Sequence, residues 1–413
     1  MDFMKRGSIV APLACRHFNQ ISAPLSQVIE LRRQKYVSNR GKLTNLGDEL
    51  SRVSRPRRFK MPPLPSVQDL LRIYRLKTVR HLAQVFLLRE DIARHIARSL
   101  GSLTDYTVYE IGPGPGIITR EILKQFPQKI VTIEKDFRFR PIITMLQTAA
   151  EEMNSSLELL TEDCLEHDFT ESSRSFQGSQ QWSDEPPNLA IIGNLPFNIS
   201  LPFLVKLLHD VDKKSGLFQH GRTKMAFTFQ REVAEQLVAN EGDDKRGRLS
   251  LMAQSMCHVD FVLTISNSVF VPKPACETGL VTFEPRVNKL IDVPLPYFEK
   301  LVKAVMHYKN KPCFKGLMDL FPKTISKKCA IRMCEDADIP RDLYPRFLTF
   351  DHMQRLADVY FKMCKEHDNL FEYNYQKPRV NVPQSLLDLF DEFETNSETG
   401  FAFEDESENL QNA

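Results

Sequence analysis

Residues 106–126 constrain the fold most, because they combine a strand, a glycine-rich turn and a helix. Residues 106–111 (YTVYEI) are β-branched and aromatic, which is typical of a buried strand. The turn 112–116 (GPGPG) follows, and the spacing predicts a helix over 117–126, ended by Pro127. Glycine lets the backbone approach a ligand closely, and the start of a helix offers free N–H groups. The segment therefore predicts a nucleotide-binding α/β fold.

The spacing of the glycines distinguishes between possible nucleotides. An NAD-binding fingerprint has a third glycine five positions after the first, and here Ile117 takes that position. The pattern E-x-G-x-G-x-G, from Glu110 to Gly116, instead resembles motif I of S-adenosylmethionine-dependent methyltransferases.

Two acidic residues follow later strands of the same pattern. The strand predicted for 130–134 ends in Glu134, where a carboxylate can accept hydrogen bonds from both hydroxyls of a ribose. Asp163 follows the strand-like residues 157–160 and suits an adenine amino group. The alternatives are a surface carboxylate for Glu134 and an ordinary turn aspartate for Asp163.

A fourth apolar strand, 189–192, runs directly into Gly193 and the run Asn194-Leu195-Pro196-Phe197. The asparagine amide offers both an acceptor and donors, and proline fixes a bend that turns carbonyl groups into a cleft. An aromatic face can stack on a base. This set suits a planar exocyclic amine that is methylated by positioning and electrostatics, with no metal site. The alternative is a tight turn closed by Asn and Pro.

Residues 193–200 (GNLPFNIS) resemble motif IV of the ribosomal-RNA adenine N6-dimethyltransferase family. Further resemblances to this family lie in residues 84–87 (QVFL), 229–235 (FQREVAE), 247–250 (GRLS) and 270–274 (FVPKP). The resemblance covers about residues 61–375 and is strongest to the mitochondrial branch. It implies an α/β, class I (Rossmann-like) methyltransferase domain with a small C-terminal helical domain. It also implies S-adenosylmethionine as cofactor and dimethylation of two adjacent adenines in a small-subunit rRNA hairpin, which supports ribosome assembly.

The resemblance also assigns roles to individual residues. The expected cofactor-binding residues are Gln84, Phe86, Leu87, Gly112, Gly114, Glu134, Asp163 and Asn194. The expected catalytic residues, which would hold the target amine and stack on its base, are Asn194, Leu195, Pro196 and Phe197. The chain departs from the family at Val85, where the family has Asn, and at Arg246, where it often has Tyr.

Two other functions remain open from the sequence. Val85 favours a non-catalytic module, similar to a transcription factor or an assembly factor, that retains the fold. An amino methyltransferase acting on DNA or protein is the other alternative. Such enzymes usually carry a second proline where this chain has Leu195.

Charge is distributed very unevenly along the chain. Residues 1–60 contain 13 Lys/Arg and 4 Asp/Glu, residues 380–413 contain 9 acidic and no basic residues, and residues 61–379 contain 42 basic and 40 acidic residues. We therefore expect a basic mitochondrial targeting arm (1–60), a methyltransferase domain (61–285), a helical RNA-binding domain (286–379) and an acidic disordered tail (380–413). The expected location is the mitochondrial matrix. A disordered basic arm that contacts nucleic acid is the alternative for residues 1–60.

The expected partners are small-subunit rRNA and the pre-ribosomal small subunit, with mitochondrial DNA or the transcription machinery as a further candidate. Basic residues scattered along the core would form a cleft for the phosphate backbone, although a solvated surface explains each one alone. They are Arg94, Arg98, Arg248, Lys273, His307, Lys309, Lys311, Lys315 and Lys323. No apolar run approaches the 18–20 or so residues of a membrane span, so we expect no membrane partner. The eight cysteines lack metal-ligand spacing, which predicts reduced thiols and no zinc.

Overall fold

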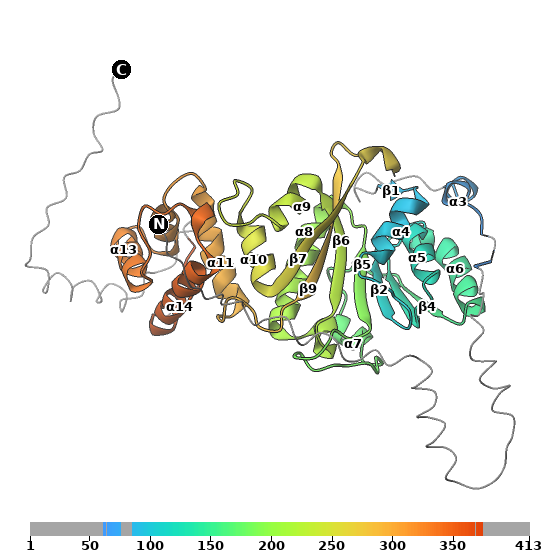
Figure 1. The fold of residues 1–413 in the computed structure, drawn as a ribbon, viewed down its shortest axis with the longest axis horizontal. Coiled ribbons are helices and arrows are strands. Elements are labelled where there is room, and N and C mark those ends of the chain that lie inside the picture. Colours follow the sequence, from blue (N-terminus) through green and yellow to red (C-terminus); the bar gives the residue numbers. More distant parts are fainter. Residues whose placement is uncertain (1–60, 63, 76–84, 368, 375–413) are drawn as a thin grey trace, which may run out of the picture. The chain divides into compact units, whose positions relative to one another are not determined.

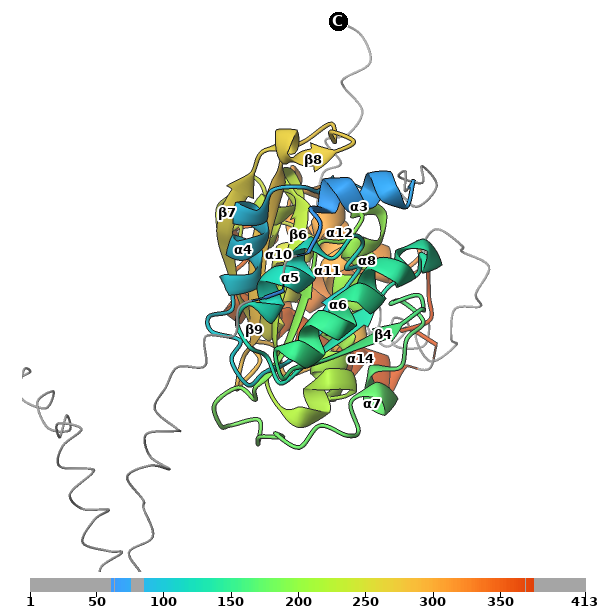
Figure 2. The ribbon, with the colours of Figure 1, turned by 90° about the vertical axis from the view of Figure 1, so that its right-hand side faces the viewer.

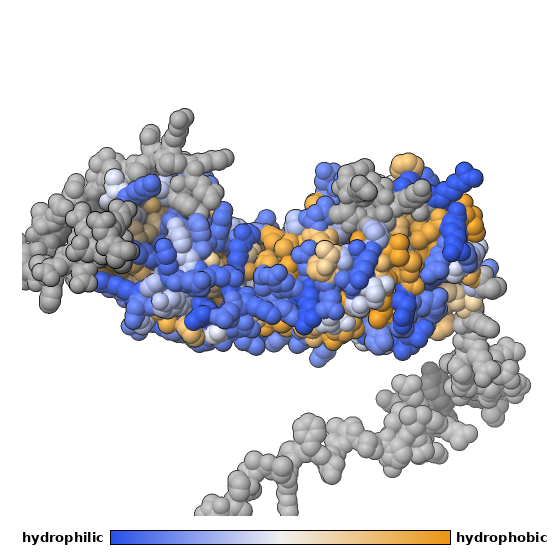
Figure 3. All heavy atoms as spheres, turned by 90° about the horizontal axis from the view of Figure 1, so that it is seen from above, coloured by the Kyte–Doolittle hydropathy of each residue, from blue (hydrophilic) through white to orange (hydrophobic). Residues whose placement is uncertain are grey.

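The computed structural model describes residues 61–62, 64–75, 85–367 and 369–374. The predicted targeting arm, the acidic tail and Gln84 lie outside these ranges. No helix among the described residues is long and apolar enough to cross a bilayer. The face seen in Figure 3 is largely hydrophilic, with separate hydrophobic patches.

A seven-stranded sheet in the order β4-β3-β2-β5-β6-β9-β7 forms the centre of the fold (Figure 1). Its strands are β2 (Thr107–Ile111), β3 (Lys129–Ile133), β4 (Ser156–Leu160), β5 (Leu189–Gly193), β6 (Lys224–Gln230), β7 (Cys257–Ile265) and β9 (Thr278–Pro285). The strands from β4 to β6 are parallel, whereas β9 runs antiparallel to both of its neighbours. A separate two-stranded ladder pairs β1 (Phe86–Leu87) with β8 (Phe270–Val271).

The chain order of the parallel strands creates a reversal beside β2. From β2 the chain proceeds outward to β3 and β4, and then returns to β5 on the other side of β2. In open α/β sheets, ligands bind beyond the carboxyl ends of the strands at such a reversal. The topology therefore places a binding site where β2 and β5 end.

Helices cover both faces of the sheet (Figure 2). One face packs against α4 (Glu90–Arg98), α5 (Ile117–Leu123) and α6 (Arg140–Glu152), and the other against α8 (Phe197–Lys213), α9 (Arg231–Leu237) and α10 (Arg248–Met256). Because strand side chains alternate, Val108 enters the first core and Tyr109 the second. Two short helices are α3 (Val67–Ile73) and α7 (Phe169–Ser172).

After Pro285 the described chain, through residue 374, is helical. Its helices are α11 (Leu295–Val305), α12 (Cys313–Leu317), α13 (Ser326–Asp336) and α14 (Phe350–Glu366). Three short 3-10 helices lie among them: η5 (Met306–Tyr308), η6 (Met318–Leu320) and η7 (Pro345–Phe347). The earlier part of the described chain contains η2 (Phe137–Phe139), η3 (Gly216–His220) and η4 (Asn267–Val269). Asp212 of α8 accepts the backbone N–H of Leu295 at 2.9 Å, which connects α11 to the sheet-bearing part. The division into domains at 285 stays a prediction.

The predicted strands agree with the observed ones to within one residue at their ends. Ser66 caps α3 by accepting the N–H of Asp69. The helix predicted over 117–126 is too long. It ends at Leu123, because the following turn tightens: Gln125 and Phe126 donate to carbonyls only three residues back, and Phe126 adopts a φ of 58°.

Candidate active site

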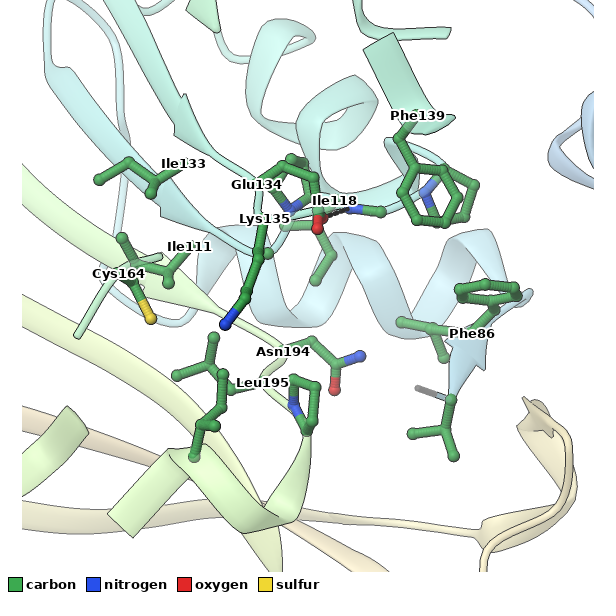
Figure 4. Close-up of a pocket in the computed structure, with 18 of the residues that line it drawn as sticks. Phe86, Ile111, Ile118, Ile133, Glu134, Lys135, Phe139, Cys164, Asn194 and Leu195 are labelled. Atoms are coloured by element: carbon green, nitrogen blue, oxygen red, sulfur yellow. Dashed lines mark hydrogen bonds between the residues drawn. The ribbon is translucent and has the colours of Figure 1, made fainter. Parts of the chain in front are cut away.

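A pocket of about 240 Å³ lies at the carboxyl ends of β2, β3 and β5. Nine of the predicted site residues line it: Phe86, Leu87, Gly112, Gly114, Glu134, Asp163, Asn194, Leu195 and Pro196. Glu134 and Asn194 approach it from different strands (Figure 4). Residues up to 110 positions apart in the sequence therefore meet at the point that the topology indicates.

Glu134 connects the end of β3 to the glycine-rich turn. Its carboxylate accepts the N–H of Gly114 at 3.0 Å and the N–H of Asp136 at 2.8 Å, and its side chain is almost fully buried. Burial raises the pKa of Glu134 to about 7. Gly112 and Gly114 adopt φ values of 65° and 51°, which side-chain-bearing residues rarely adopt. The turn is thus shaped by its glycines and held in place by Glu134.

A second carboxyl group, Glu110, lies beneath this turn and was not among the predicted site residues. It is only 1% exposed, and neither of its oxygens has a hydrogen-bond partner among the described residues. Burial raises the pKa of Glu110 to about 8. The position of Glu110 at the start of the motif could have identified it as a site residue. Burial of a carboxyl group without a hydrogen-bond partner is unfavourable, so an acidic residue inside a predicted buried strand indicates a special role.

Asp163 is already engaged on both of its oxygens. Its Oδ1 accepts the N–H of Leu165 at 2.9 Å, and its Oδ2 pairs with the Lys135 ammonium at 2.7 Å. The hydrogen bond with Lys135 lowers the pKa of Asp163 and raises that of Lys135. Lys135 also lines the pocket, and sequence reasoning missed it although it directly follows Glu134.

Lys206 of α8 holds the loop that carries Asp163 in place through hydrogen bonds to its backbone. The ammonium of Lys206 donates to three carbonyl oxygens, of Cys164 at 3.1 Å, Leu165 at 2.9 Å and His167 at 2.8 Å. One side chain thus uses all three of its donors on one turn. Since these partners lie about 40 residues earlier in the chain, no local pattern predicts the contact.

Asn194 follows β5 directly and lines the pocket. Gly193 lets β5 pass close to its neighbours, because a Cβ at this position would lie 3.0 Å from the Ile111 carbonyl oxygen. Asn194 Oδ1 accepts a hydrogen bond from the Thr228 hydroxyl at 2.7 Å. Phe197, the first residue of α8, is half-buried and is not among the residues that line this pocket.

Apolar side chains form the ends of the pocket. Phe86 and Phe139 meet edge to face at one end, with ring centroids 5.6 Å apart, and Ile111, Ile133 and Cys164 lie at the other (Figure 4). Val85 also lines the pocket. Such a site, apolar with a few placed carboxylates and an amide, suits a ligand that combines a flat ring with hydroxyl and amino groups.

The predicted basic cleft is only partly available for RNA. Arg94 pairs with Glu121 at 3.1 Å, and Arg248 pairs with Glu299 at 3.0 Å. Lys309, however, lines a separate hollow between the loop after α9 and the turn before α14. Two arginines, Arg246 and Arg346, share that hollow with it, but Arg246 is buried and Arg346 pairs at 2.6 Å with Asp244, which also lines the hollow. Sequence reasoning noted Arg246 only as a departure from the family.

Known proteins resemble this chain over most of its length. Residues 75–349 match the family model "Ribosomal RNA adenine dimethylase". The chain is 42% identical to the mitochondrial dimethyladenosine transferase 1 of Bos taurus over 77% of this chain and 92% of that protein, and 42% identical to the Homo sapiens protein over 77% and 91%. A solved dimethyladenosine transferase from Plasmodium falciparum shares the fold, with 19% identity, a TM-score of 0.50, and coverage of 66% of this chain and 96% of that one. The chain therefore belongs to the ribosomal RNA adenine dimethylase family.

Proposed function

We propose that this protein transfers methyl groups from S-adenosylmethionine to N6 of two adjacent adenines in a small-subunit rRNA hairpin, two to each adenine. Membership of the rRNA adenine dimethylase family supports the reaction. The observation that carries the proposal for this chain is the position of Asn194 and Leu195 in the wall of the same pocket that contains Glu134 and the glycine turn. The groups that would accept hydrogen bonds from the target amine and the groups that would bind a nucleoside thereby line one cavity.

The residues of the pocket fit S-adenosylmethionine. Each oxygen of Glu134 keeps one lone pair beyond its backbone hydrogen bond, and these lone pairs suit the two ribose hydroxyls. Asp163 Oδ1 and Oδ2 likewise retain acceptor capacity for an adenine amino group. Phe86, Leu87, Gly112 and Gly114 would surround the rest of the cofactor. Gln84, the other expected ligand, lies outside the described residues.

The chain's own part in the reaction is to hold the target amine. When bound, S-adenosylmethionine would supply the methyl group from its sulfonium to the N6 lone pair, the C–S electron pair would remain on sulfur, and one N6 proton would leave to water. Asn194 Oδ1 and the Leu195 carbonyl accept the N6 hydrogens, which withdraws the lone pair from the ring and aims it at the methyl donor. Pro196 fixes this bend, and Phe197, at the start of α8, stacks on the base as it enters.

We further propose that the RNA backbone is bound along the cations beside this pocket. Lys273 follows β8, which pairs with β1 at the pocket, and the exposed Lys309 lines a hollow of its own. Exposed lysines suit phosphate, since an ammonium group can pair with a phosphate oxygen as a point charge. The substrate would be presented in the pre-ribosomal small subunit. In a duplex, pairing and stacking hold the adenine inside the helix. The target adenines must therefore be unpaired and unstacked before N6 can enter the pocket.

We propose a mitochondrial matrix location. The basic residues 1–60 support it, and the relatives from Bos taurus and Homo sapiens carry "mitochondrial" in their names. Fusion of residues 1–60 to a fluorescent protein tests this directly. Import into mitochondria is expected, and a cytosolic signal would contradict the proposed location.

The reaction is tested by transfer of a tritiated methyl group to a synthetic small-subunit rRNA hairpin with two adjacent adenines. We expect N6,N6-dimethyladenosine in the digested product, and no label with the Asn194→Ala variant. A wild-type chain that binds both S-adenosylhomocysteine and the hairpin without transferring label would contradict the enzymatic role. The non-catalytic assembly or transcription role would then replace it.

A further inference from the structure

Thr228 of β6 is in contact with the residue that we propose to hold the target amine. Its side chain is fully buried, and its hydroxyl lies 2.7 Å from Asn194 Oδ1. The contact follows from the register of the sheet, in which Gly193 of β5 pairs with Phe227 of β6. Because the two strands are parallel, the next residue of each lies side by side at the edge of the pocket.

The hydroxyl of Thr228 has one hydrogen-bond partner in the part of the chain that the structure describes, and that partner is the Asn194 amide. An asparagine amide can rotate by 180° with almost no change in shape, which exchanges its oxygen and its NH2 group. With the oxygen toward Thr228, the hydroxyl hydrogen is bonded. With the NH2 toward Thr228, the hydroxyl would become the acceptor, and its own hydrogen would be buried without a partner, which is unfavourable.

The orientation of this amide matters for the reaction. An adenine amino group donates two hydrogen bonds, so it needs acceptors in front of it. Asn194 Oδ1 has two lone pairs, of which Thr228 uses one and leaves the other for the substrate. In the rotated amide an NH2 group would replace this acceptor and would face another NH2 group.

We infer that Thr228 is a positioning residue for methyl transfer: its hydroxyl fixes the Asn194 amide with the oxygen available to the target amine. This inference rests on the proposed function. Threonine suits the task, because a β-branched side chain has a restricted χ1 and holds its hydroxyl in one direction. Thr228 itself is separated from the substrate by Asn194, so it acts through that residue alone.

The test compares three variants that change the hydroxyl and the volume independently. Thr228→Val keeps the shape without the hydroxyl, Thr228→Ala removes the hydroxyl and volume together, and Thr228→Ser keeps the hydroxyl. We expect kcat on the rRNA hairpin to fall about tenfold in the Val and Ala variants, comparable to the loss of one hydrogen bond. Thr228→Ser should stay within about threefold of wild type.

Three further measurements separate positioning from a structural role. The Kd for S-adenosylhomocysteine, the KM for the hairpin and the urea midpoint of Thr228→Val should remain near wild type. The Asn194→Asp background gives a matched control, because a carboxylate has two equivalent oxygens and needs no orientation. In the Asn194→Asp background, Thr228→Val should therefore reduce kcat by a much smaller factor than it does in the wild-type chain.

The outcomes distinguish the inference from the function on which it rests. An active wild type whose Thr228→Val and Thr228→Ala variants keep more than half of its kcat would overturn the positioning role and leave the proposed function intact. Equal losses in the Ser, Ala and Val variants would also overturn it, since a retained hydroxyl must restore activity. A wild type without any transfer would overturn the proposed function and this inference together.

Discussion

The ammonium of Lys135 lies 2.7 Å from the carboxylate of Asp163, so the residues after two neighbouring strands, β3 and β4, are joined at the pocket wall. Both side chains line the pocket. The contact lowers the pKa of Asp163, which therefore stays ionised at neutral pH. Asp163 is thereby kept as an acceptor next to the proposed adenine position.

Replacement of Asp163 by alanine should weaken the binding of S-adenosylhomocysteine about tenfold, because one hydrogen bond to a charged acceptor is lost. Asp163→Asn keeps an acceptor and should lose less. Lys135→Met is the comparison and should weaken binding less than Asp163→Ala, because the Lys135 side chain is 62% exposed and exposed ion pairs contribute little. Calorimetric titration measures all three affinities. Unchanged binding in Asp163→Ala would exclude an adenine contact at this residue.

Binding of the ribose should depend on pH through Glu134. The pKa of this carboxyl is raised by burial from 4.5 to about 7. The ionised form accepts hydroxyl hydrogens, so affinity should increase from pH 6 to pH 8 and level off above the pKa. The probe is 5′-methylthioadenosine, which retains the ribose but lacks the amino-acid group and its own titration. Glu134→Gln should bind more weakly and without this pH dependence, and an unaltered pH profile in that variant would refute the assignment.

The raised pKa of Glu134 also predicts how the stability of the ligand-free protein depends on pH. Stability should decrease as the pH rises, whereas the affinity for the ribose should increase. Between pH 4.5 and about 7 the folded chain retains a proton on Glu134 that the unfolded chain releases. The free energy of unfolding should therefore decrease as the pH rises through this range. Glu110, with a pKa of about 8, contributes in the same direction to a higher pH. Urea unfolding at several pH values measures the slope, which Glu134→Gln should reduce below pH 7.

The strands, the glycine turn and nine of the residues that line the pocket were predictable, because each depends on a local pattern or on a motif of a few residues. Glu134 and Asp163 could be placed because acids at the ends of successive parallel strands meet at one edge of a sheet. The roles of Thr228 and Lys206 could not be predicted, since their hydrogen-bond partners lie 34 and about 40 residues earlier in the sequence. The end of α5 at Leu123 was also missed, because its last turn tightens before the proline that ends the pattern.

Loss of the Lys206 ammonium should destabilise both the fold and the cofactor site. In Lys206→Met the carbonyls of Cys164, Leu165 and His167 lose their shared donor, which should lower the free energy of unfolding by about 2–3 kcal/mol. Because the same turn presents Asp163, binding of S-adenosylhomocysteine should weaken as well. Lys213→Met, at an exposed position of the same helix, is the control. Equal urea midpoints for the two variants would show that the three hydrogen bonds contribute nothing.

Gly316 of α12 sets how closely that helix packs on α11. A Cβ at this position would lie 2.9 Å from the Val305 Cα and would also collide with the Ala304 carbonyl oxygen. Intrinsic helix propensity favours Gly316→Ala by about 1 kcal/mol. Overpacking against a backbone costs about 1–3 kcal/mol or more, and since no flexible side chain can move aside here, we expect the steric cost to be larger. The variant should therefore lower the free energy of unfolding by about 2 kcal/mol.

Gly247→Ala provides the matched comparison for this prediction. Gly247 precedes α10 with an extended φ of −164°, and a Cβ there would approach only the flexible end of Lys309, at 3.3 Å. Because alanine is a poorer N-cap than glycine, this replacement should lower the free energy of unfolding by about 0.5–1 kcal/mol. Urea unfolding should thus separate the two variants clearly. If Gly316→Ala were as stable as Gly247→Ala, α12 could move away from α11 without cost, and the close contact of these helices would not be a requirement of the fold.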